Sequence, residues 1–105
     1  MDVQIQSGTL QGEERDRIRV FLGIPYAASP VGDLRFAAPR PPEPWSGVRN
    51  ATQFAHQAPQ VETRSHRLVG NEDCLVVNVY TPVADGPHSV LVWIHGGDTS
   101  KRSIV

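Results

Sequence analysis

The stretch "NEDCLVVNVYTPVADGPHSVLVWIHGG", residues 71–97, holds the two apolar segments that decide which sheet this chain can form. Residues 75–80 alternate so that Leu75, Val77 and Val79 would share one face of a strand. Residues 90–94 are five consecutive apolar residues. A strand that is apolar on both faces is typical of the middle of a sheet covered on both sides. We therefore predict two sheet strands, the second of which needs covering layers.

The residues upstream predict further β-structure and a long irregular connection. "DVQIQSGTLQGEE", residues 2–14, alternates around its apolar residues and predicts a hairpin that turns at Ser7 and Gly8. A strand is expected over residues 18–22. Six of the nine prolines lie within residues 25–44. Because proline lacks an amide donor and fixes φ, this part is expected to be an extended loop that wraps over something larger.

The middle of the chain offers little helix. Residues 50–57 predict one helical turn with Asn50 as its N-cap. Residues 61–73 are polar and predict a mobile loop. The layers that would cover residues 90–94 are thus not visible in the sequence.

Composition excludes several classes of function. The chain has 105 residues, 39% hydrophobic and 20% charged, as in ordinary globular domains. A net charge of −1 gives no field that would attract nucleic acid or an anionic membrane, and no stretch approaches the roughly 18 apolar residues of a membrane span. The first residues do not resemble a signal peptide. Cys74 is the only cysteine, which excludes an internal disulfide and predicts a cytoplasmic protein.

Three stretches together resemble the type B carboxylesterase family, the cholinesterase-like branch of the α/β-hydrolases. They are "FLGIPYAASPVGDLRFAAPRPPEPW" (residues 21–45), "NEDCLVVNVYTP" (residues 71–82) and "VLVWIHGG" (residues 90–97). Family members are several times longer. The resemblance implies that residues 1–97 form the N-terminal part of an α/β-hydrolase domain, β-rich, with an N-terminal hairpin, a proline-rich loop and two sheet strands. Residues 98–105 diverge from the family pattern.

The resemblance also implies a reaction, hydrolysis of a small-molecule carboxylic ester without a cofactor. A serine in a Gly-x-Ser-x-Gly elbow attacks the ester carbonyl, a histidine takes its proton, and an acidic residue orients the histidine. None of the seven serines here has that setting. In the family all three groups follow the glycine turn in sequence. We therefore expect no catalytic residue in these 105 residues, and no activity from them alone.

Part of an oxyanion hole is expected at the glycine turn, because family members use backbone N–H groups there. The run is His95-Gly96-Gly97-Asp98, so Gly96 and Gly97 match and Asp98 replaces a third glycine. A carboxylate about 4 Å from an oxyanion repels it by about 4 kcal/mol at an effective dielectric of ~20. That corresponds to roughly a thousandfold in rate. The alternative is that Gly96 and Gly97 only end a strand.

Other candidate residues have structural interpretations. The resemblance implies an ion pair between Arg35 and Glu72 that ties the proline-rich loop to the sheet. No histidine cluster or spaced carboxylates indicate a metal site. Cys74 has no activating histidine nearby in sequence, so it is not expected to be a nucleophile. Secreted family members pair this cysteine with one at the position of Ala58, which again favours an intracellular protein.

The predicted function is therefore the N-terminal fragment of a serine esterase. Two alternatives remain, a non-catalytic cholinesterase-like binding or adhesion module, which Asp98 would suit, and a truncated reading frame without function. The resemblance also implies that a later strand lies between residues 75–82 and residues 90–94. We expect residues 90–94 to lose burial without it, leaving the chain marginal in stability and prone to aggregation.

Overall fold

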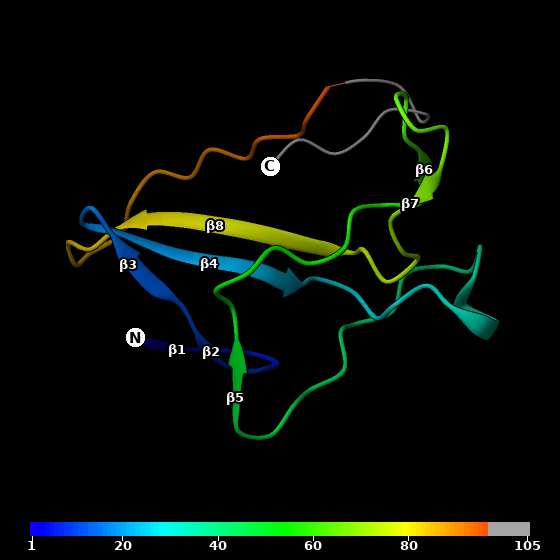
Figure 1. Cartoon of the computed structure of the whole chain (residues 1–105). Helices are drawn as coiled ribbons and strands as arrows, with labels where there is room; N and C mark the ends of the chain where they lie inside the picture. The colour runs from blue at the N-terminus through cyan, green and yellow to red at the C-terminus, as the bar shows by residue number, and fades with distance from the viewer. Residues whose placement is uncertain (97–105) are drawn as a thin grey trace.

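The computed structural model describes residues 1–96 and shows a β-rich molecule (Figure 1). Within these residues there is no α-helix. The strands are β1 Asp2–Ile5, β2 Gly8–Gln11, β3 Glu13–Arg15, β4 Ile18–Pro25, β5 Val48–Asn50, β6 Gln60–Val61, β7 Leu68–Val69 and β8 Val76–Pro82, and the one helical turn is the 3-10 helix η1 Gly32–Leu34. No helix in this part of the chain is long and apolar enough to cross a membrane.

The first sheet has the order β1-β2-β5. β1 and β2 are antiparallel with Val3 opposite Leu10, which confirms the predicted hairpin. Its turn lies at Gln6 and Ser7, one residue earlier than predicted. β5 joins β2 in parallel, a pairing between distant residues that the sequence pattern did not reveal.

The second sheet has the order β3-β4-β8 and holds the longest strands, which run side by side in Figure 1. β3 and β4 form a hairpin whose turn residues, Asp16 and Arg17, have positive φ values of 50° and 66°. Two positive φ values are typical of the primed turns that match the twist of a hairpin. β4 pairs antiparallel with β8. The strand predicted over residues 18–22 is confirmed, since β4 begins at Ile18.

β4 runs three residues further than the predicted end at Leu22, because a bulge carries it through Gly23. The register shifts between Phe21 and Ile24, and Gly23 has a φ of 71° that favours glycine. The amide of Gly23 donates to Asn78 Oδ1 of β8 at 2.9 Å. Asn78 therefore accepts a hydrogen bond from the amide at the irregular point of the ladder, which accounts for an amide side chain within this strand.

The core lies between the two sheets. Leu10, Phe21 and Ala51 are 1%, 6% and 1% exposed, and half-buried Trp45 packs against them. Trp45 Nε1 donates to the carbonyl of Thr9 at 2.9 Å. The indole lies so close to β2 that a Cβ added at Gly8 would come within 2.5 Å of it. Trp45, at the end of the proline-rich loop, thus packs that loop against the first sheet.

Two predictions about local structure are wrong. Residues 90–94 form no strand, because no described segment supplies the backbone partner that a strand needs. Residues 50–57 hold no helical turn; instead Asn50 Oδ1 accepts from the amide of Thr52 at 2.9 Å, which closes a local turn. The polar residues 61–73 also contain part of a small antiparallel hairpin, β6–β7, that was not predicted.

Candidate functional site

Of the glycine turn that the sequence singles out, the structure describes His95 and Gly96. Gly96 ends the extended segment of residues 90–96, and a Cβ added to it would meet nothing within 4 Å. His95 Nδ1 lies 3.1 Å from the carbonyl oxygen of Gly96, a contact within the turn itself. Gly97, Asp98 and the rest of the divergent tail lie outside the described residues. An oxyanion hole needs donors fixed at 2.7–3.1 Å from one point, and Gly96 has no neighbour here to fix it.

The structure brings Arg35 and Glu72 together. Arg35 Nη2 lies 2.9 Å from Glu72 Oε1, so the residue after η1 contacts the segment that leads into β8. The two side chains are 60% and 38% exposed, so water and salt screen the pair. Arg35 also lies 5.6 Å above the ring of Phe36, a residue with a positive φ of 59°. The pair therefore links the proline-rich loop to the segment before β8, at the position that the resemblance implied.

A wide groove separates β8 from the segment that follows it. The groove has a volume of about 1220 Å³, above the roughly 300–1,000 Å³ of most small-molecule pockets. One wall is β8, including Val77 and Val79, and the other is the apolar segment of residues 90–93. Such apolar side chains normally lie in a hydrophobic core, and here they are exposed along the groove.

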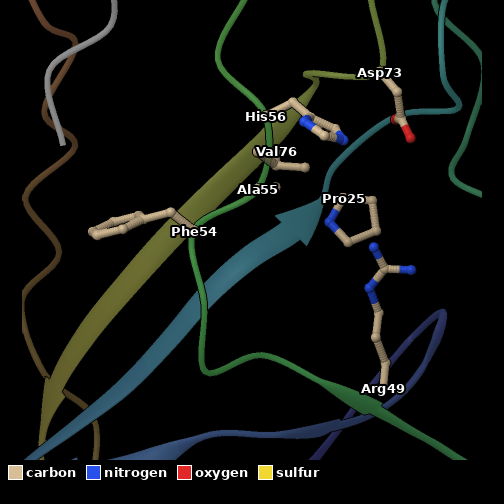
Figure 2. A pocket seen from close by; sticks show the side chains of 7 residues that line it. All are labelled: Pro25, Arg49, Phe54, Ala55, His56, Asp73 and Val76. Atoms are coloured by element: carbon tan, nitrogen blue, oxygen red, sulfur yellow. The ribbon is translucent and has the colours of Figure 1, made fainter. Parts of the chain in front are cut away.

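A smaller hollow of about 320 Å³ lies where β4 ends and β8 begins (Figure 2). Its titratable residues are Arg49, His56 and Asp73, none of which was predicted to be a site residue. The Arg49 guanidinium lies 5.4 Å above the ring of Trp45, which gives it a structural partner. No serine, threonine or cysteine is among the seven residues that line this hollow, so it offers no nucleophile for acyl transfer.

Cys74 does not resemble a catalytic thiol. It is half-buried just before β8. Burial raises the pKa of its thiol, and the negative charges of Asp73 and Glu72 raise that pKa further. A nucleophilic cysteine needs the opposite setting, since the thiolate is the reactive form. Among residues 1–96, no group of three or more histidine, cysteine or acidic residues could hold a metal ion.

Comparison with known proteins identifies the family. The model of the Carboxylesterase family matches residues 1–104. The chain belongs to the carboxylesterase family. It is 47% identical over 100 residues to phenmedipham hydrolase of Pseudarthrobacter oxydans, covering 87% of this chain and 20% of that protein. It is 43% identical over 100 residues to liver carboxylesterase B-1 of Rattus norvegicus, covering 80% of this chain and 18% of that one.

Solved esterase structures share the fold of this chain. A PNB esterase is 40% identical with a TM-score of 0.71, covering 79% of this chain and 17% of its own. A Geobacillus stearothermophilus carboxylesterase is 44% identical with a TM-score of 0.65, covering 81% of this chain and 17% of its own. The predicted α/β-hydrolase class is therefore confirmed, in the form of a small β-rich part of that fold. The carboxylesterase chain spans about a fifth of the length of the curated relatives it matches.

Proposed function

We propose that this carboxylesterase chain is the part of a serine esterase that supplies backbone donors to the oxyanion hole and one wall of the ester pocket. The nucleophilic serine, the histidine and the acid belong to residues outside the 105 given. The carrying observation is the family match over residues 1–104 in a sequence without a Gly-x-Ser-x-Gly elbow. The substrate class is a small carboxylic ester, in keeping with relatives named as esterases and carboxylesterases.

The chemical role follows from what a serine esterase must stabilise. When serine attacks the ester carbonyl, the carbonyl oxygen gains negative charge, and a fixed N–H donor there is worth about 2.7–4 kcal/mol. Gly96 and Gly97 carry no side chain, so their backbone can approach that oxygen closely. The carboxylate of Asp98 opposes the same charge, and at about 4 Å the cost of about 4 kcal/mol would cancel one donor.

A chimera tests the proposal directly. The part of the PNB esterase that this chain matches is replaced by residues 1–105, and hydrolysis of a short-chain nitrophenyl ester is measured. We expect turnover that requires the elbow serine of the PNB esterase, and we expect Asp98→Gly to raise kcat by about 10²–10³-fold, since it removes the opposing charge.

The variant Asp98→Asn serves as the matched control, because it keeps the size of the side chain and removes its charge. A chimera that folds by circular dichroism but stays inactive with glycine or asparagine at position 98 would overturn the proposed role. Equal activity of all three forms would show that Asp98 does not face the oxyanion.

We also propose a reducing compartment, the cytoplasm, as the working place of the protein. Support comes from Cys74, whose thiol has no second cysteine in the sequence with which to pair. In protein extracted from its own cells under alkylating conditions, the thiol of Cys74 should be free and therefore alkylated. A disulfide to another molecule at Cys74 would contradict the proposal.

A further inference from the structure

We propose that the proline-rich segment of residues 39–44 is a docking site for a protein domain that binds polyproline II helices in an aromatic-lined groove. The sequence of this segment is PRPPEP. It belongs to the connection between η1 and β5, which runs along the outside of the molecule (Figure 1). The proposed esterase role makes no use of this segment.

The covalent chemistry of the segment holds its backbone in the polyproline II conformation. Four of its six residues are prolines, and each proline ring fixes φ at about −65°. The other two, Arg40 and Glu43, each precede a proline, which drives a residue to extended φ and ψ. In agreement, residues 38–45 form no helix, strand, turn or bend, and none of them has a positive φ.

The spacing of the prolines places two of them on one exposed edge. A polyproline II helix has about three residues per turn and rises about 3.1 Å for each, so side chains three positions apart share an edge. Pro41 and Pro44 therefore lie on the same edge, about 9 Å apart. Both are exposed, whereas Pro42, on a different edge, is half-buried. Two exposed prolines at P-x-x-P spacing are the pattern that aromatic-lined grooves bind.

The neighbouring edge carries two opposite charges. Arg40 and Glu43 are also three positions apart, and both are exposed. Neither side chain forms an ion pair with another of residues 1–96. A groove with an acidic and a basic residue about 9 Å apart at its rim would complement both charges. Such complementary charges select a partner and fix its register on the helix.

The fold holds the segment at both ends. The amide of Ala28 donates to the carbonyl of Arg40 at 2.9 Å. The amide of Trp45 donates to the carbonyl of Ser7 at 3.0 Å. Between these points, no backbone hydrogen bond joins residues 41–44 to another described residue. Their carbonyl oxygens are therefore open to the donors of a partner, and an already ordered segment loses little conformational entropy on binding.

Titration against a panel of SH3, WW and EVH1 domains tests the inference. Each domain is titrated with the chimera described above, with the isolated chain and with the free peptide of residues 37–46. We expect at least one domain to bind the chimera and the chain as tightly as the peptide or more tightly, because the fold presents the segment already ordered. Binding to none of the three overturns the inference. Binding to the peptide alone also overturns it, because the fold would then cover the segment.

Matched proline variants locate the contact. Pro41→Ala combined with Pro44→Ala should weaken binding about 10-fold or more. Pro87→Ala, at an exposed proline outside the segment, should leave binding unchanged. Arg40→Glu, which keeps every proline, should also weaken binding, because it reverses one of the two charges. Equal binding by the unmodified protein, the double proline variant and Arg40→Glu would place the contact elsewhere and overturn the inference.

Discussion

Of two apolar runs in this chain, one is buried and the other is exposed. Val20, Phe21 and Leu22 of β4 are 2%, 6% and 2% exposed, whereas the five residues 90–94 are 75–89% exposed. Both runs are uninterrupted, and both are predicted as strands. The difference is that β4 has partners on both sides, β3 and β8, while residues 90–94 have none among the described residues. A run of apolar residues indicates that the segment needs to be buried. It becomes buried only where another segment packs against it.

The energetic size of this difference is large. At roughly 1.5–3 kcal/mol for each large apolar side chain, the exposure of residues 90–94 forgoes on the order of 10 kcal/mol. Folded domains have a total stability of about 5–15 kcal/mol. The two runs therefore differ by about as much as a whole domain gains on folding, and substitutions in them should behave accordingly.

The largest contrast is expected between Phe21→Ala and Ile94→Ala. Phe21 is 6% exposed in the core, so its truncation should cost about 3–5 kcal/mol. Ile94 is 84% exposed, so the same change should fall within about 0.5 kcal/mol. Urea unfolding followed by the fluorescence of Trp45, in a Trp93→Phe background, measures both. Equal losses would show that the two runs are buried alike.

Two glycines sharpen the same comparison. Gly8→Ala should destabilise the chain by about 1–3 kcal/mol, because φ is 151° and the new Cβ would lie 2.5 Å from Trp45. Gly96→Ala should have no measurable effect, since a Cβ there meets nothing within 4 Å. The same unfolding assay applies. A loss of more than 1 kcal/mol at Gly96 would mean that the glycine turn is packed in the isolated chain.

Prediction from the sequence succeeded where the residue pattern of a segment was enough to specify its secondary structure. The hairpin predicted over residues 2–14 and the strand predicted over residues 75–80 appear as β1–β2 and β8, because alternation and turn residues specify them. The β3–β4 turn was missed because Asp16 and Arg17 give no glycine signal. The parallel contact of β5 with β2 depends on distant residues. The strand predicted over residues 90–94 was wrong, because no segment of residues 1–96 pairs with it.

The predictions about site residues also depend on whether the contacts of a residue lie within the described chain. The resemblance named Arg35 and Glu72, and the two lie 2.9 Å apart, since both belong to the part of the chain that packs on itself. It also named Gly96 and Gly97, which follow the segment without partners. A Cβ added at Gly96 would meet nothing within 4 Å, so the described residues do not supply its surroundings and no local pattern could predict them. The one local signal overlooked was Asn78, a lone amide in an apolar strand, whose role at the bulge of β4 is structural.

A smaller effect is expected at the ion pair. In a double-mutant cycle of Arg35→Gln and Glu72→Gln, the coupling should be about 0.2–1 kcal/mol and should fall as salt rises, because both groups are partly exposed. Thermal unfolding at low and high salt measures it. A coupling above 2 kcal/mol, or one insensitive to salt, would contradict a screened pair.

The smallest effect concerns the reactivity of Cys74. Burial first, and then Asp73 and Glu72, raise the pKa of the thiol, so less thiolate is present at any pH below that pKa. The rate of alkylation should therefore rise with pH at a higher midpoint than for glutathione. Asp73→Asn should lower the midpoint, and Asp85→Asn, away from the thiol in sequence, should leave it unchanged. A midpoint below that of glutathione would contradict the described setting.

The most direct test of the account is amide hydrogen exchange on the purified monomeric chain. We predict slow exchange over residues 20–22, which pair with β3 and β8 or pack in the core. We predict exchange near the rate of an unfolded peptide over residues 91–94, which have no strand partner among the described residues. Slow, globally cooperative exchange across residues 91–94 in the monomer would show that this segment is buried without a partner and would contradict the account.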